Sequence, residues 1–130
     1  MRAFRFRLCL VMVFAGLAGC GSSLRVTDIQ LGRSLNPDRT VGGHTISFRP
    51  DETIYLSVFT AGVGSGTIMV RWMYRGRVLD EPSKKVSYTD VAATDFSLKS
   101  VAGFPPGEYS AEVFLDGQSA GTRTFRVDAH

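Results

Sequence analysis

Apolar and polar residues alternate along several short stretches of the chain, and this alternation is typical of β-strands. Residues 67–74 show it most clearly, because an apolar side chain stands at every second position: Ile68, Val70, Trp72 and Tyr74. Successive side chains of a strand point to opposite faces, so a period of two predicts a strand with one buried face. Similar β-rich stretches predict further strands at residues 24–31, 45–48, 53–60, 77–79, 84–88, 94–98, 108–115 and 122–128.

Turn-forming residues separate the predicted strands at regular intervals. Asp116-Gly117 is a strong signal for a two-residue hairpin turn, and Arg75-Gly76 and Asn36-Pro37-Asp38 predict further turns. Residues 62–66 are rich in glycine and predict a flexible loop. Seven to nine short strands at this spacing indicate an all-β, antiparallel sandwich or, as the alternative, a small barrel. No long stretch of helical period follows residue 20, which argues against folds that alternate helices and strands.

Two features of these strands resemble an immunoglobulin-like domain. Trp72 lies in a mid-chain strand, as the core tryptophan of that fold does in its third strand. Tyr109 follows Pro105-Pro106-Gly107 and stands two residues before Ala111, which resembles the tyrosine corner ahead of the second core cysteine. With alanine at that cysteine position, the chain resembles the variants of the fold that have no disulfide, such as fibronectin type III-like domains. The resemblance implies an immunoglobulin-like sandwich of seven to nine strands over residues 24–130.

The beginning of the sequence has a different pattern, which is typical of an export signal. Arg2, Arg5 and Arg7 precede an uninterrupted run of apolar or small residues at positions 8–19. A basic start followed by a short apolar run and small residues is the composition of a secretory signal peptide. The run has 12 residues, whereas a membrane-spanning helix needs about 20. We therefore expect a helical signal peptide that is removed rather than a permanent span.

The apolar run ends in Leu17-Ala18-Gly19-Cys20, which resembles the lipobox of bacterial lipoproteins. The resemblance implies cleavage before Cys20, a diacylglyceryl thioether on its sulfur and acylation, as by palmitate, of its new amine. Two or more acyl chains anchor a protein stably to a membrane. Because Gly21 rather than aspartate follows the cysteine, the resemblance implies the outer membrane, with the domain facing the periplasm. The alternative is a soluble secreted protein cut near Ala18.

The predicted organisation is a signal peptide at residues 1–19, a lipidated cysteine with a short tether at residues 20–23, and one domain at residues 24–130. The full sequence has 15 Lys and Arg against 12 Asp and Glu, a formal net charge of +3. Loss of the three signal-peptide arginines lowers the basic count to 12 and the net charge to 0. The basic character therefore belongs to the signal, and we expect no nucleic-acid partner. With Cys9 removed and Cys20 lipidated, the domain has no free thiol and no disulfide.

Residue types that carry enzyme chemistry are sparse after the signal. The histidines are His44 and the terminal His130, and no cysteine is free, so we predict no transition-metal site. The acidic pairs Asp51-Glu52 and Asp80-Glu81 leave calcium as an alternative to ordinary turns or strand ends. Gly64-Ser65-Gly66 lies between two predicted strands, outside the strand–turn–helix context of a nucleophile elbow. We therefore expect no enzyme activity, no cofactor and no metal.

One face of the predicted sandwich is a candidate binding surface. If strands 67–74 and 108–115 are neighbours, as in an immunoglobulin-like sheet, their outward side chains share one surface: Met69, Arg71, Met73, Glu112 and Phe114. The methionines and Phe114 would form an apolar patch that an Arg71–Glu112 pair crosses. Exposed apolar patches often mark partner surfaces, and methionine adapts to irregular ones. The alternative is that the N-terminal segment or an extra strand covers this face.

These features favour a non-enzymatic lipoprotein of the cell envelope. The lipid at Cys20 would hold it to the membrane, and the domain would act as a binding or scaffolding module for an envelope protein. A second hypothesis is an accessory or inhibitor module that acts on a secreted enzyme or secretion complex through a rigid loop at residues 62–66 or 104–107. A third, a small hydrolase, requires His44 beside carboxylates in a polar pocket.

Overall fold

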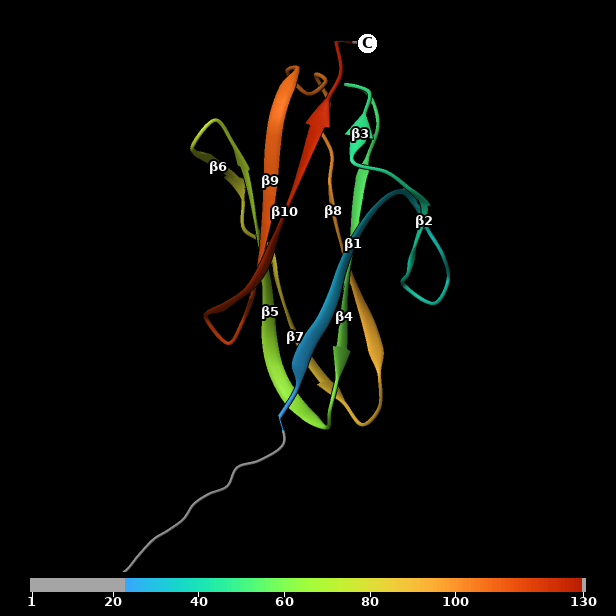
Figure 1. Ribbon diagram of the computed structural model, residues 1–130, viewed down its shortest axis with the longest axis vertical. Coiled ribbons are helices and arrows are strands. Elements are labelled where there is room, and N and C mark those ends of the chain that lie inside the picture. Colours follow the sequence, from blue (N-terminus) through green and yellow to red (C-terminus); the bar gives the residue numbers. More distant parts are fainter. Residues whose placement is uncertain (1–22, 130) are drawn as a thin grey trace, which may run out of the picture.

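Ten β-strands make up the part of the chain that the structure, a computed structural model, describes: residues 23–129 (Figure 1). A four-stranded sheet has the order β2-β1-β4-β8, and a six-stranded sheet has the order β3-β10-β9-β5-β6, with β7 also paired to β5. The strands are β1 (Arg25–Leu35), β2 (Val41–His44), β3 (Ser47–Phe48), β4 (Ile54–Ala61), β5 (Gly64–Tyr74), β6 (Arg77–Asp80), β7 (Ser83–Tyr88), β8 (Ala92–Leu98), β9 (Gly107–Leu115) and β10 (Gln118–Val127). Residues 23–129 include no helix long and apolar enough to cross a membrane.

The two sheets pack face to face around one core, which confirms the predicted all-β sandwich (Figure 1). The period of two places the apolar side chains of β4 and β5 inward, and Ile68, Val70 and Trp72 have no exposed surface. The edge of the Trp72 ring faces Phe125 of β10, with ring centroids 6.0 Å apart. Ala111, at the position of the second core cysteine, is also fully buried. Packing without a disulfide therefore forms the centre of this sandwich.

The strand count is higher than the seven to nine expected, because residues 25–48 form a longer first strand and two short ones. β1 runs on to Leu35 and returns as β2 through a turn that Asn36 closes by donating its backbone N–H to Thr40, 2.8 Å away. The strand predicted at residues 45–48 is reduced to β3, which pairs with β10 in parallel. Every other strand pair in the described part of the chain is antiparallel.

The hairpin turns follow the sequence prediction, but the glycine-rich loop does not. Asp116-Gly117 and Arg75-Gly76 all have positive φ, between 50° and 85°, as a type I′ turn requires. The loop expected at residues 62–66 is wrong, because β5 already begins at Gly64 and only Gly62 and Val63 make the turn. The predicted signal peptide lies outside the described residues.

Side chains close both long edges between the two sheets. On one side, the Arg123 guanidinium of β10 donates to the backbone oxygen of Ile29 in β1, with Nε 3.0 Å from the oxygen. On the other side, the hydroxyls of Tyr88 in β7 and Thr94 in β8 are 2.8 Å apart. The Lys84 ammonium of β7 also donates to the backbone oxygen of Asp95 in β8. These contacts hold the two sheets in a fixed position relative to each other. They therefore also fix the shape of the outer faces of the sandwich.

The predicted tyrosine corner is present, since the Tyr109 hydroxyl donates to the backbone oxygen of Pro105. We expect Tyr109→Phe to lower the free energy of unfolding by about 1–2 kcal/mol, because the variant loses the partly buried hydrogen bond from Tyr109 to the backbone oxygen of Pro105. Chemical denaturation of the purified domain measures this loss. Tyr55→Phe, on the outer face of the other sheet, is the matched control. Equal stability of the two variants would show that the corner hydrogen bond contributes nothing.

Candidate functional site

The candidate face is assembled as the sequence pattern indicates. β5 and β9 are antiparallel neighbours, and their register places Met69 opposite Phe114 and Arg71 opposite Glu112. Met73 lies opposite Ser110 in the same register. The five candidate residues are therefore on one outer surface, here named the outer β5–β9 face, and each is half-buried: Met69, Arg71, Met73, Glu112 and Phe114.

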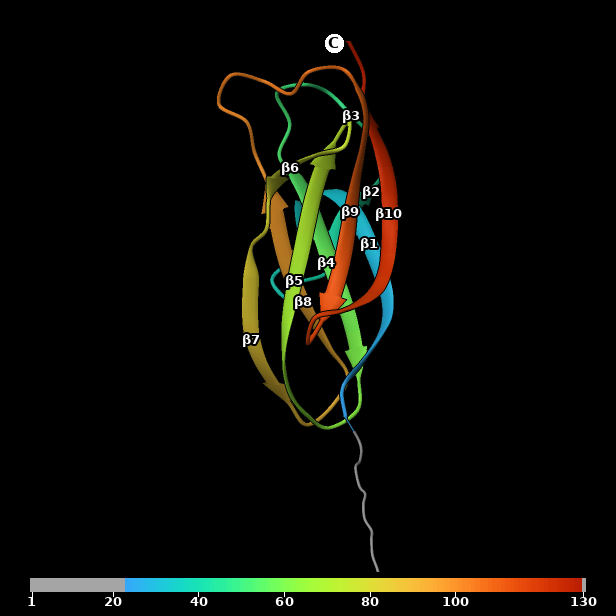
Figure 2. The ribbon, with the colours of Figure 1, turned by 90° about the vertical axis from the view of Figure 1, so that its left-hand side faces the viewer.

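The N-terminal strand does not cover this face. β1 belongs to the other sheet, where it pairs with β2 and β4. Figure 2 shows the six-stranded sheet from its outer side, and none of the described segments crosses the middle of β5 and β9. Within residues 23–129, the apolar side chains of this face are accessible to another molecule.

The ion pair predicted between Arg71 and Glu112 is wrong. The Arg71 guanidinium instead pairs with Glu81, whose Oε2 is 2.6 Å from Nε, because the β5–β6 hairpin returns Glu81 to the side of β5. The same guanidinium lies over the Phe114 ring, 4.7 Å from the ring centroid, in a cation–π contact. Arg71 therefore contacts both Glu81, after β6, and Phe114, in the apolar part of the face. Glu112 lies opposite Arg71 on β9.

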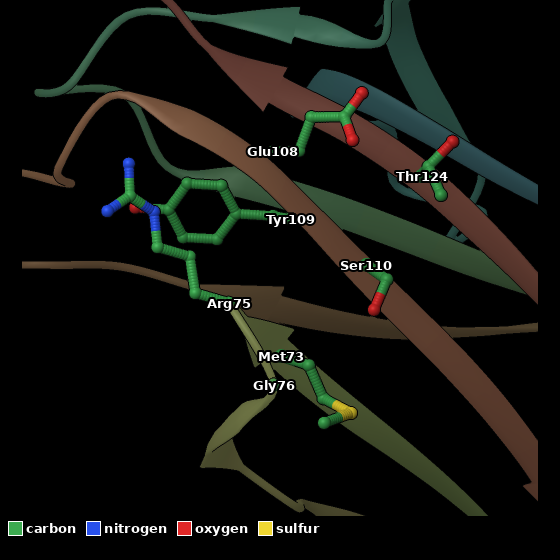
Figure 3. Close-up of a pocket in the computed structure, with 7 residues that line it drawn as sticks. All are labelled: Met73, Arg75, Gly76, Glu108, Tyr109, Ser110 and Thr124. Atoms are coloured by element: carbon green, nitrogen blue, oxygen red, sulfur yellow. The ribbon is translucent and has the colours of Figure 1, made fainter.

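An open depression of about 390 Å³ extends the outer β5–β9 face toward the β5–β6 turn. It forms because the small Ser110 of β9 stands between two larger residues in register, Met73 of β5 and Thr124 of β10. Figure 3 shows its lining residues, which are Met73, Arg75, Gly76, Glu108, Tyr109, Ser110 and Thr124. The lining combines a methionine side chain with hydroxyls and with charges of both signs.

The sequence interpretation missed the part of the depression formed by β9 and β10. Glu108 and Ser110 have the same parity as Glu112 and Phe114, so they lie on the same face. Extending the register to β10 would have added Thr124. The period-of-two signal was thus present in the sequence, but polar residues near the beginning of a strand, such as Glu108 and Ser110, do not by themselves indicate a depression.

Tyr109 borders the depression but takes part in the core. Burial raises the pKa of its hydroxyl above the ordinary value, and the neighbouring Tyr74 adds to the shift. The hydroxyl therefore stays protonated as the donor to Pro105. Its ring stacks on that of Phe125, with centroids 5.4 Å apart. Tyr109 thus supports the floor of the depression and is not placed to exchange protons.

The residues considered for metal binding or catalysis do not come together. His44 ends β2 in an exposed position and does not line the depression. The acidic pairs are engaged by arginines, since Glu52 pairs with Arg33 at 2.9 Å and Glu81 pairs with Arg71. Residues 23–129 contain no group of three or more histidine, cysteine or acidic side chains that would hold a metal ion. The lipobox, Cys20 and His130 lie outside the described residues.

Neither segment proposed for an inhibitor forms a separate protruding loop. Residues 62–66 are mostly part of β5, and Phe104 is buried with its ring edge against Tyr109, 5.9 Å between centroids. Within the β8–β9 connection, residues 99–103 stand out instead, because Val101 is fully exposed, and Figure 2 shows this connection projecting from the sandwich. Residues 99–103 are therefore open to a contact with another molecule.

Comparison with known proteins defines the fold. No family model matches the chain, and no curated protein matches its sequence. An immunoglobulin-like protein from Pseudomonas aeruginosa superposes on it with a TM-score of 0.57 and 13% sequence identity, over 84% of this chain and 99% of that chain. The fold is an immunoglobulin-like sandwich. The resemblance seen at Trp72 and Tyr109 is thereby confirmed at the level of the fold.

The same sandwich forms part of larger proteins. A β-glucosidase from Listeria innocua matches with a TM-score of 0.53 and 11% identity, over 83% of this chain but 16% of that enzyme. An alkylpurine DNA glycosylase from Pseudomonas fluorescens matches with a TM-score of 0.51 and 13% identity, over 84% of this chain and 31% of that one. At these identities the similarity shows the fold alone.

Proposed function

We propose that this protein is a non-enzymatic binding or scaffolding module of the cell envelope that is held to the outer membrane by lipid on Cys20. Its partner is an envelope protein that docks on the outer β5–β9 face. The observation that carries the proposal is the open apolar surface of Met69, Met73 and Phe114, which continues into the depression beside Ser110. No enzyme chemistry is needed for this role.

The composition of the face suits a protein partner. Protein interfaces are enriched in aromatic residues, methionine and arginine at the centre and have a polar rim. The outer β5–β9 face has Phe114 and the two methionines at its centre, with the Arg71 guanidinium lying over the Phe114 ring. Glu108 and Arg75 lie at the depression, at one end of the face. Charges of both signs there would orient a partner without requiring it to be strongly acidic or basic.

Met73→Glu is expected to abolish partner binding while the domain stays folded. Met73 is half-buried on the outer face and lines the depression. A carboxylate at this position stays hydrated in the free domain, but burying it against an apolar partner surface would be costly. Affinity purification of the tagged protein from envelopes, quantified by mass spectrometry, measures the loss of specific proteins relative to the wild type. Ile46→Glu is the matched control, because Ile46 is 62% exposed and stands away from this face, before β3.

The accessory or inhibitor hypothesis is the second candidate, and the fully exposed Val101 favours it. Val101→Glu separates the two hypotheses in the same purification. Loss of the partner with Val101→Glu but not with Met73→Glu would assign binding to the β8–β9 loop and contradict the proposed face. An unfolded Met73→Glu variant, detected by circular dichroism, would contradict it too, because the face would then belong to the core.

A further inference from the structure

Two exposed valines stand at the end of the sandwich where the described chain begins. Val63 immediately precedes Gly64, which pairs with Tyr88 at the end of β7, and Val91 lies in the short connection from β7 to β8. The two turns are therefore neighbours at one end of the molecule, as Figures 1 and 2 both show. Val63 is 57% exposed and Val91 is 73% exposed. We name this end, defined by Val63 and Val91, the valine end.

The valine end is also the end nearest to the proposed lipid. The backbone oxygen of Ser23 lies so close to Gly62 that a Cβ on that glycine would be 2.5 Å from it. Cys20 stands three positions before Ser23. Three residues span at most about 10 Å, so a lipid on Cys20 would hold the β4–β5 turn within about that distance of the bilayer. This step rests on the proposed lipid anchor.

We infer that the valine end docks on the phospholipid surface and places Val63 and Val91 among the lipid headgroups. Arg25, which begins β1 beside the β4–β5 turn, and Asp90, next to Val91, are exposed and carry opposite charges. Their charges offset one another, so the apolar side chains and not attraction to anionic lipid hold the surface. Docking would direct the long axis of the sandwich away from the membrane. The outer β5–β9 face would then be roughly perpendicular to the membrane surface. A partner that moves along the membrane could reach it.

A fluorescent label at Thr89, between β7 and β8, tests the docking. Cys9 and Cys20 are the only cysteines of the sequence, so Thr89→Cys provides the sole free thiol once the signal is removed and Cys20 is acylated. The full lipidated protein is reconstituted in vesicles of phosphatidylethanolamine and phosphatidylglycerol, with a nitroxide lipid as quencher. We expect quenching of the label in the parent protein. In the double variant Val63→Asp, Val91→Asp, the ratio of docked to undocked protein should fall by about tenfold, because two valines lose apolar contact with the bilayer.

The control variant carries Ile46→Asp and Val101→Asp, which change exposed apolar residues away from the valine end, and should leave quenching unchanged. If the parent protein floats with the vesicles but its label is quenched no more than in the valine variant, docking is contradicted and the anchor stands. If the protein does not float with the vesicles, the proposed anchor fails, and the inference fails with it. Should the aspartate variant unfold, Val63→Ser with Val91→Ser takes its place, with the same expected direction.

Discussion

Trp72→Ala is expected to lower the free energy of unfolding by about 3–5 kcal/mol, because it removes the largest fully buried side chain of the core. The indole fills the space between the sheets and meets Phe125 edge to face. Neighbouring strands hold the residues around it, so the core can only partly close over the vacated volume. Equilibrium denaturation in urea, followed by circular dichroism, gives the loss directly.

Trp72→Phe distinguishes packing from hydrogen bonding at this site. The indole Nε1 is buried and has no hydrogen-bond partner among the described residues. Phenylalanine therefore sacrifices no hydrogen bond, and the expected loss is about 1–2 kcal/mol from the smaller volume alone. A loss in Trp72→Phe as large as that in Trp72→Ala would mean that the indole nitrogen contributes, and the packing explanation would be wrong.

Cys20→Ala is expected to move the protein almost completely from the membrane to the soluble fraction of the envelope. Each buried methylene of an acyl chain contributes about 0.8 kcal/mol of membrane affinity, so losing the lipid removes far more binding than the protein surface supplies. Fractionation followed by intact-mass measurement detects both the change of compartment and the missing acyl groups. Cys9→Ala is the matched control, since Cys9 lies inside the predicted signal peptide and should leave the anchor intact.

A Cys20→Ala protein that remains fully membrane-bound at the mass of the cleaved chain would contradict the lipid anchor. Its retention would then have to come from a partner in the membrane or from the valine end. The intact mass distinguishes this result from retention by an uncleaved signal, which adds 19 residues to the chain.

The alternation of apolar residues was sufficient to predict most of the fold. In residues 67–74 the period of two is a local property of the backbone, so it identified the buried side of β5, Trp72 included, without knowledge of its partners. The adjacency of β5 and β9 came from the immunoglobulin-like resemblance and is present in the register. The signal predicted a strand at residues 45–48 but not its reduction to the two residues of β3, because that strand pairs with β10 at the far end of the chain.

The details of the candidate site depended on contacts that a sequence pattern does not contain. Arg71 had two carboxylates within the reach of a long side chain, and its choice of Glu81 follows from how the β5–β6 hairpin returns. The depression exists because a small residue, Ser110, falls between Met73 and Thr124, on two different neighbouring strands. Both features depend on three-dimensional register, so they became visible only in the structure.

A photoreactive amino acid at position 73, activated in intact envelopes, tests most directly whether the outer β5–β9 face binds a protein. The account predicts one discrete crosslinked product at this position, which disappears when Phe114→Glu is added and persists with Ile46→Glu. The same amino acid at position 101 should give no such product. A crosslink at position 101 with none at position 73 would contradict the proposed binding face.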